Sequence, residues 1–432
     1  MFRCIFLIIV TFQMAPICAQ SATLNKIVDS FIKNNPELSR LKAEVSAGKS
    51  GVNEAKRAYL PSISLNGRAL KQDAPRINAF APKPPDKIYS TFLELYQPIY
   101  LGGQIAAGIK GRNAEYNLAK MQLDYSKNQL LVGLISDLMD YNVKLKELKV
   151  LKSSEKTVRS FLRTTRKRHK SGGARDYELA QVESDYYSYG PRLLAKDLEI
   201  QNLKTKISIS SGLADFSKID WDWEKIPNIE ALLRDSKKIN TLTSRSDYAV
   251  LLEQKKLAEV NTKLNTAEFK PTLNITGQWG YQGYETSRNM FKEESESESI
   301  ALNLTIPVFS GFRKSAVKSA GLSKEDSISS QIESFKLNFG AELSQSLETL
   351  TRSQSNLKNT KKWRSKAYSA LTSAQRDFKK GLITQADIVQ LQRSYELAET
   401  GYLSSLKTFY LAKINREFIL GKDIEKIYGK DI

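Results

Sequence analysis

The spacing of apolar residues changes along the first part of the chain. Apolar side chains recur every three or four residues up to Pro61, and this spacing predicts a helix over residues 23–58. Beyond Pro61 the spacing becomes two, which predicts β-strands over about residues 61–71 and 88–98. Helical spacing then resumes, so the two strands form a hairpin between helices.

The same succession returns about 210 residues later. Pro61 corresponds to Pro271, and the strand exit at Pro98 corresponds to Pro307. The second copy has a predicted helix at about 241–268 and predicted strands over about 271–284 and 298–307. One structural unit of about half the chain is therefore used twice.

This duplication sets the domain organisation that we expect. The first repeat covers residues 20–212, and the second covers 241–432 with a short polar C-terminal tail. Residues 213–240 have no counterpart in either repeat and are expected to form an irregular connecting segment at the equator of the molecule. The two hairpin tips are expected to be exposed loops, one Pro-rich (81–85) and one acidic and Ser-rich (293–298).

Two proline-free stretches, 104–168 and 311–379, predict very long helices. The first would extend roughly 97 Å at 1.5 Å per residue. Shorter helices are expected to return from each, over about 174–210 and 384–420. The apolar residues of the first stretch alternate spacings of three and four, which is the heptad pattern of a coiled-coil seam; they are Leu131, Leu134, Leu138, Tyr141, Leu145 and Leu148.

The N-terminus has the pattern of a secretory signal peptide over residues 1–19, in which Arg3 precedes a short apolar run; cleavage after Ala19 or after Ala22 fits. Both cysteines, Cys4 and Cys18, lie in this segment, so the mature chain would have no disulfide. His169 is the only histidine. These counts argue against Cys/His zinc sites and Ser–His catalysis, and we expect no enzyme activity, no catalytic residue, no metal and no cofactor.

After the signal segment, no stretch is apolar for the roughly 18 residues that a membrane-spanning helix needs. The predicted strands have the length, alternation and aromatic residues of transmembrane β-strands. Two soluble hairpins packed on a core would show the same alternation. That alternative is weakened because the hairpins lie between long helices and have no other β-structure to pack against. If the strands lie in lipid, four cannot close a barrel, two chains would give a filled eight-stranded barrel, and a conduit needs at least three chains.

The order of these features resembles that of the TolC-like outer-membrane efflux and secretion channel family, over essentially the whole mature chain. The resemblance rests on the signal peptide, the duplicated helix–hairpin–helix–helix unit, the paired Pro…Gly strand exits and the turn from Gly381 to Asp387-Ile388-Val389-Gln390. It implies a mostly α protein with a β-barrel portion. Each chain would supply long antiparallel coiled-coil helices to a periplasmic α-barrel and four transmembrane strands to a twelve-stranded barrel.

The resemblance also implies a homotrimer in the outer membrane of a Gram-negative bacterium, and partners that include outer-membrane lipid, a periplasmic adaptor (membrane fusion) protein and an inner-membrane pump. The narrow end of the pore would lie at the helical tips, where Asp387 matches one acidic position and Gln390 occupies a second. Their counterparts in the first repeat are Glu178 and Gln181. An alternative is that Asp387 is an ordinary carboxylate near a helix N-terminus, where the helix dipole favours it.

The chain has a net charge of +19, and part of this excess comes from Lys and Arg residues near the predicted helical tips. The simplest interpretation of the positive charge is that lysines coat long solvated helices, because Lys and Glu alternate through most of them. Two further hypotheses are that the tip cations attract an acidic adaptor tip, or that they bias the pore entrance toward anions. The candidate tip and adaptor contacts are Gly172, Gly381, Arg166, Arg168, Lys379 and Lys380. The tip cations are Arg159, Arg163, Arg166, Lys167, Arg168 and Lys170 in the first repeat, and Lys361, Lys362, Arg364, Lys366, Arg376, Lys379 and Lys380 in the second.

The function that we expect is a passive exit duct in a tripartite export system, gated at its periplasmic tip, for either type I protein secretion or multidrug efflux. A periplasmic coiled-coil adaptor or structural protein without a pore is the alternative, but it leaves the two alternating hairpins unexplained. A basic coiled coil that binds nucleic acid is opposed by the signal peptide, so no nucleic-acid partner is expected.

Overall fold

The computed structural model describes most of the chain as two compact units, and both units take residues from both sequence repeats. Unit 1 is built from 1–39, 126–239 and 342–432, and unit 2 from 40–125 and 240–341. The predicted signal peptide, most of the connecting segment and Gly381 lie outside the described residues. The structure describes residues 22–73, 85, 87–213, 219–220, 242–286, 289–380 and 382–428.

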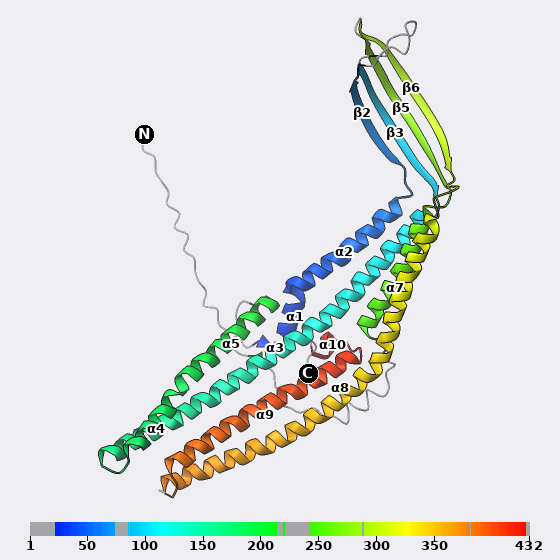
Figure 1. Cartoon of the computed structure of the whole chain (residues 1–432). Coiled ribbons are helices and arrows are strands. Elements are labelled where there is room, and N and C mark those ends of the chain that lie inside the picture. The colour runs from blue at the N-terminus through cyan, green and yellow to red at the C-terminus, as the bar shows by residue number, and fades with distance from the viewer. Residues whose placement is uncertain are drawn as a thin grey trace, which may run out of the picture. The chain divides into compact units, whose positions relative to one another are not determined.

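Unit 2 contains one sheet of four antiparallel strands in the order β2-β3-β5-β6 (Figure 1). The central pair β3–β5 joins the two sequence repeats, with Leu95 opposite Gly277, and Gly277 in turn opposite Ile300. The strands are β2 (Ser62–Lys71), β3 (Lys87–Leu101), β5 (Thr272–Thr286) and β6 (Asn289–Thr305).

The acidic segment 293–298 is part of strand β6, so the expectation that it forms a loop is wrong. Within it Glu296 pairs with Tyr281, and Glu298 pairs with Trp279. The reason is that glutamate and serine alternate in this segment with a period of two, in phase with Ile300 and the apolar residues that follow. The Pro-rich segment 81–85 lies outside the described residues except for Pro85.

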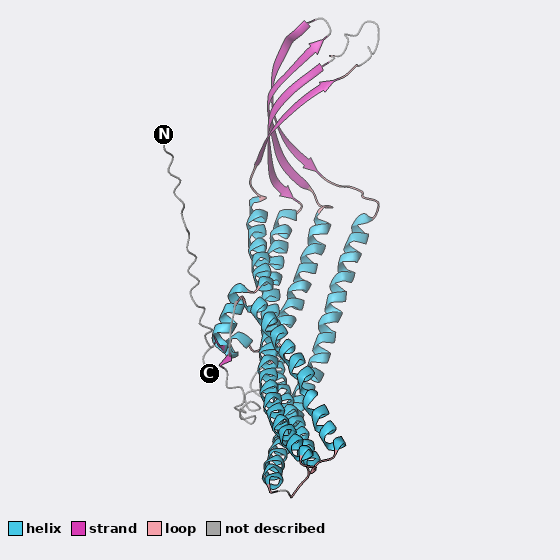
Figure 2. Cartoon of the chain, turned by 90° about the vertical axis from the view of Figure 1, so that its left-hand side faces the viewer, coloured by secondary structure: helices cyan, strands magenta, loops and turns pink. Residues whose placement is uncertain are grey.

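The two faces of the sheet differ in polarity, because successive side chains of a strand point to opposite faces. Register places Asn66, Phe92 and Gly280 in one row on the mainly polar face. None of the described helices of unit 2 covers either face (Figure 2). The other face exposes large apolar side chains, namely Ile63, Leu65, Leu93, Leu95, Ile300, Leu302 and Leu304.

The first predicted helix is divided in two, as α1 (Leu24–Asn34) and α2 (Pro36–Arg57). The division occurs because the Asn35 side chain accepts hydrogen bonds from the backbone N–H groups of Glu37 (3.0 Å) and Leu38 (3.1 Å). This is an N-cap, and proline is favoured at the position that follows it. The expectation of one unbroken helix over 23–58 is therefore wrong.

The helix predicted over about 174–210 is likewise divided at Ser188, into α4 (Asp176–Tyr187) and α5 (Tyr189–Ser211). Pro191 lies in the first turn of α5, where its missing N–H and its ring disfavour continuation of the preceding helix. The other short elements are α7 (Ser246–Ala267), α10 (Ile424–Tyr428) and the parallel pair of β1 (Ala22–Thr23) and β4 (Ile219–Asp220).

Two long helices, α3 (Gln104–Lys170) and α8 (Arg313–Lys379), contain 67 residues each, and the chain returns along α8 as α9 (Gln385–Ile419). None of the helices in the described part of the chain combines the length and the hydropathy that a bilayer crossing requires. The core of unit 1 lies between these helices and α1 and α5, and its fully buried side chains include Phe31, Leu131, Leu138, Ile207, Leu350, Leu357 and Phe409.

Candidate functional site: the helical tips of unit 1

The turn from α3 to α4 depends on glycine. Gly172 has φ +74°, a left-handed conformation that is strained for other residues. The Gly173 N–H donates to the Arg168 carbonyl oxygen at 2.8 Å, which closes the end of α3, and the Arg168 guanidinium donates back to the Gly173 carbonyl at 2.9 Å. Gly172 and Arg168 therefore shape the turn itself.

The turn from α8 to α9 ends in a capping box. The Thr384 hydroxyl accepts from the Asp387 N–H at 3.3 Å, and the Asp387 carboxylate accepts from the Thr384 N–H at 3.0 Å. The Thr384 hydroxyl and then its backbone N–H hold the pKa of Asp387 below its ordinary value. Asp387 is therefore ionised at neutral pH, and its charge is fixed at the first turn of α9, where the helix dipole favours it.

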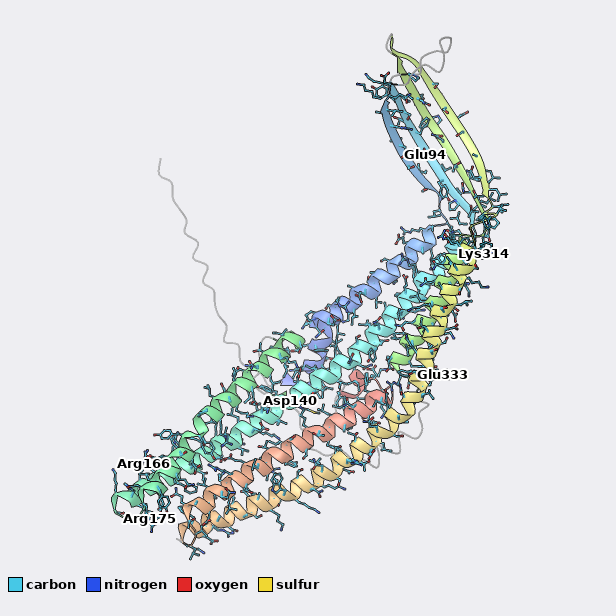
Figure 3. The ribbon with its side chains drawn as sticks, viewed as in Figure 1. Glu94, Asp140, Arg166, Arg175, Lys314 and Glu333 are labelled. Carbon is cyan, nitrogen blue, oxygen red and sulfur yellow. The ribbon has the colours of Figure 1, made fainter. Side chains whose placement is uncertain are left out.

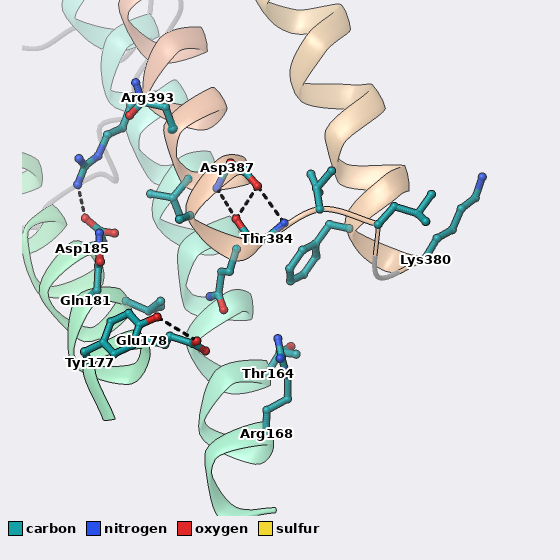
Figure 4. Close-up of a pocket in the computed structure, with 18 residues that line it drawn as sticks. Thr164, Arg168, Tyr177, Glu178, Gln181, Asp185, Lys380, Thr384, Asp387 and Arg393 are labelled. Carbon is teal, nitrogen blue, oxygen red and sulfur yellow. Dashed lines mark hydrogen bonds and ion pairs between the residues drawn. The ribbon is translucent and has the colours of Figure 1, made fainter. Parts of the chain in front are cut away.

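The four residues predicted at the constriction line one cavity of about 1190 Å³ between the ends of the α3–α4 and α8–α9 hairpins. Glu178 and Gln181 come from α4, and Asp387 comes from the start of α9 (Figure 4). Gln390 lies one turn further along α9. Residues about 209 positions apart in the sequence thus meet at one place, in line with the duplication. Leu382 and Ile383, from the intervening turn, also line the cavity.

The charges that line this cavity are balanced. Arg168, Lys380 and Arg393 contribute three cations, and Glu178, Asp185 and Asp387 contribute three carboxylates. Arg393 of α9 forms an ion pair with Asp185 of α4, which joins the two hairpins (Figure 4). A second contact between the hairpins is the hydrogen bond from the Thr165 hydroxyl to the Gln385 side-chain oxygen.

The remaining predicted tip contacts have different surroundings. Arg166 donates to the Glu183 carboxylate from Nη2 (2.7 Å) and Nε (3.1 Å), so it is paired within its own hairpin rather than directed into the cavity. Lys380 is exposed and lines the cavity. Gly381 and the side chain of Lys379 lie outside the described residues.

Behind the tip, a buried polar network attaches α9 to its neighbours. Glu396 accepts from the Tyr189 hydroxyl and from the Arg192 guanidinium, both at 2.7 Å, and burial raises the pKa of Tyr189. One turn further along α9, Glu399 accepts from Arg364 of α8 at 2.6 Å. Sequence patterns did not predict the network, because Glu396 lies 207 residues from Tyr189 and 204 from Arg192.

Comparison with solved structures shows that other proteins share this fold. The chain superposes on the Campylobacter jejuni CmeC outer membrane channel with a TM-score of 0.77 and 15% identity, over 92% of this chain and 85% of that one. The Vibrio cholerae outer membrane protein VceC gives a TM-score of 0.73 and 14% identity, over 93% and 97%. A membrane protein from Pseudomonas aeruginosa gives 0.74 and 17%, over 92% and 93%. Identities this low show the fold alone.

The family is identified from the sequence itself. The profile of the outer membrane efflux protein family matches residues 27–203 and 241–408, and these ranges include most of both repeats. No curated protein sequence matches the chain. The chain therefore belongs to the outer membrane efflux protein family, a family of export ducts rather than enzymes, and the predicted resemblance to TolC-like channels is confirmed.

Proposed function

We propose that three copies of this chain form one export duct, in which their sheets close a twelve-stranded barrel in the outer membrane and their helices form a periplasmic tube. The observation that carries this proposal is the two-faced sheet with two open edges. In the described residues, β2 and β6 each pair with one strand only. An unpaired edge in lipid costs several kcal/mol for each backbone group, so edges of neighbouring copies must pair.

The number of copies follows from the polarity of the sheet. Its apolar face suits lipid, and its polar face suits a water-filled lumen. Two copies would give eight strands, whose interior is filled by side chains, whereas three give twelve and leave a channel. Exposed apolar residues on the helices of unit 1 supply contacts between subunits; Leu194, Leu198 and Leu397 are 73%, 61% and 65% exposed.

At the tip, Asp387, Gln390, Glu178 and Gln181 are the proposed constriction, repeated three times around the axis. The contact between Arg393 and Asp185, together with that between Thr165 and Gln385, ties the two hairpins of a chain together. Gating then requires these contacts to rearrange, because the hairpins cannot separate while the contacts persist.

The proposed partners are a periplasmic adaptor, which would contact the turns at Gly172 and Gly381 together with Lys379 and Lys380, and an inner-membrane pump. In this proposal the duct is passive, so the pump would supply the energy for export. Type I protein secretion and multidrug efflux both fit this architecture. A periplasmic coiled-coil protein without a pore would leave the exposed apolar face of the sheet without a function.

The constriction is tested by Gln390→Cys in the mature chain, which would otherwise contain no cysteine. In a planar lipid bilayer the variant should conduct ions and then lose most of its conductance when Cd²⁺ is added. Three thiolates that converge on the axis would bind this soft cation. Gln201→Cys is the matched control, because Gln201 is exposed on α5 away from the cavity, and its conductance should persist.

The two possible failures have different meanings. Conductance of Gln390→Cys that ignores Cd²⁺ would remove Gln390 from the constriction while leaving the duct intact. The absence of any conductance from the parent protein, inserted as an intact oligomer, would contradict the duct itself.

A further inference from the structure

The positive charge of the chain is concentrated in two helical segments. Residues 149–170 of α3 contain nine Lys or Arg and one acidic residue, and 352–380, at the end of α8, contain the same numbers. Each segment carries a formal charge of +8, so together they hold +16 of the chain's +19. We refer to 149–170 and 352–380 as the basic segments.

The rest of the same two helices is electrically balanced. Residues 104–148 of α3 contain six basic and five acidic side chains, and 313–351 of α8 contain five of each. Solvation of a helix surface needs charged groups, but it favours neither sign. Solvation therefore does not explain an excess of positive charge that is confined to the two basic segments.

The cations of α3 follow the heptad of the helix on the side away from its packing. Leu151, Val158 and Leu162 are buried. A stripe of exposed cations runs along the other side for 21 residues, or about 32 Å of helix. Its members recur every seven residues in two rows, Lys149, Lys156, Arg163 and Lys170 in one and Lys152, Arg159 and Arg166 in the other.

Helix α8 also separates buried apolar residues from exposed cations, although its cations do not recur every seven residues. Leu357, Leu371 and Ala374 are buried on its packing side. The exposed cations on the remaining surface are Lys358, Lys361, Lys362, Lys366 and Arg376. Figure 3 shows the side chains along these helices, with Arg166 and Arg175 labelled near the α3–α4 turn.

Most of these cations have no partner within the described part of the chain. Arg159 pairs with Glu155, and Arg166 pairs with Glu183. No ion pair is recorded for Lys149, Lys152, Lys156, Arg163, Lys170, Lys358, Lys361, Lys362 or Lys366.

Several of the unpaired cations also repel one another. Like charges four residues apart on a helix are destabilising, and this spacing separates Lys152 from Lys156 and Lys358 from Lys362. The isolated chain therefore retains a repulsion that a bound polyanion would relieve.

We propose that the basic segments are a docking surface for an acidic α-helix of a partner protein, with carboxylates at spacings of three and four residues. A helix matches the heptad spacing of the stripe over its whole length. A membrane surface fits less well, because helices that lie on membranes combine basic residues with large apolar ones. On α3, which the test addresses, Ser153, Ser160 and Thr164 lie between the cations instead. On α8, Trp363 and Tyr368 are exposed among the cations, so the vesicle probe is needed to exclude a membrane surface.

The inference rests on the proposed function only in placing this partner in the periplasm beside the duct. Its test measures binding of the purified full-length protein to a labelled synthetic helix that carries two glutamates in every heptad. A lysine version of the peptide and vesicles of phosphatidylglycerol serve as comparison probes.

The tip variant reverses one row of cations and combines Lys149→Glu, Lys156→Glu, Arg163→Glu and Lys170→Glu. Its matched control makes the same change in net charge at exposed residues of the balanced part of α8, with Lys314→Glu, Lys318→Glu, Lys324→Glu and Lys336→Glu. We expect the tip variant to lose about tenfold or more in affinity for the acidic helix and the control about twofold or less, both measured near physiological salt.

Equal losses in the two variants would overturn the proposal, because they would indicate attraction by net charge alone. An unchanged affinity of the tip variant for the acidic helix would also overturn the proposal. The same holds if binding of the protein to the vesicles depends on these four residues. A milder variant with glutamine at the four positions should give an intermediate loss, which guards against misfolding of the reversed protein. Conductance is recorded on the same samples, so that failure of the duct and failure of the docking surface are read separately.

Discussion

Gly280→Val should prevent the sheet from forming and leave little of the protein in the outer membrane. A Cβ atom at this position would lie 2.1 Å from the Thr91 carbonyl oxygen and 2.7 Å from both the Cα and the Cδ1 of Phe92. The Phe92 ring lies against the glycine, an arrangement that stabilises glycine within a sheet. The clash with backbone cannot be relieved by rotating a side chain, so we expect a loss of at least about 3 kcal/mol.

The matched control is Gly67→Val on β2, where an added Cβ meets no atom within 4 Å. Valine favours strands, so this variant should reach the membrane at least as well as the parent. Immunoblots of outer-membrane fractions, run without heating so that oligomers persist, compare the two. Equal amounts of oligomer from both variants would show that the close approach of β3 and β5 at Gly280 is wrong.

Phe409→Ala should cause the largest loss of stability among substitutions in unit 1. The Phe409 side chain is 0% exposed on α9, and its neighbour Leu406 is also 0% exposed. Truncation of a fully buried phenylalanine leaves a cavity and costs about 3–5 kcal/mol. The midpoint of thermal unfolding, followed by far-ultraviolet circular dichroism, should fall clearly.

Leu382→Ala provides the comparison, since Leu382 is 70% exposed in the turn before α9 and should change stability by less than about 0.5 kcal/mol. An unfolding midpoint of Phe409→Ala that matches that of Leu382→Ala would contradict the packing of α9 against the core of unit 1.

Periodicity predicted the elements of this fold well where it was long and regular. The extents of α3, α8 and α9 follow from proline-free helical spacing, and β2 and β5 follow from alternation after Pro61 and Pro271. The errors arose where a local interaction overrode the pattern. The Asn35 cap divides α1 from α2, and serine–glutamate alternation extends β6 through a segment that composition alone assigns to a loop.

The candidate site was predictable only in part. Duplication and the resemblance to TolC-like channels pointed to Asp387, Gln390, Glu178 and Gln181, and all four line the tip cavity. The Thr384-x-x-Asp387 pattern predicts the capping role of Asp387. The pairing of Arg393 with Asp185 cannot be predicted from the sequence, because the residues are 208 positions apart and neither belongs to a recognisable motif. Such contacts depend on how the helices pack.

The number of chains in one channel tests the central claim most directly. Native mass spectrometry of the detergent-extracted outer-membrane complex, after removal of lipid, should give a particle of three mature chains. Pairing of β6 with β2 of the next copy closes the sheet in a ring of copies, and three copies are the fewest that leave a channel. A folded, stable particle that contains a single chain would contradict the account.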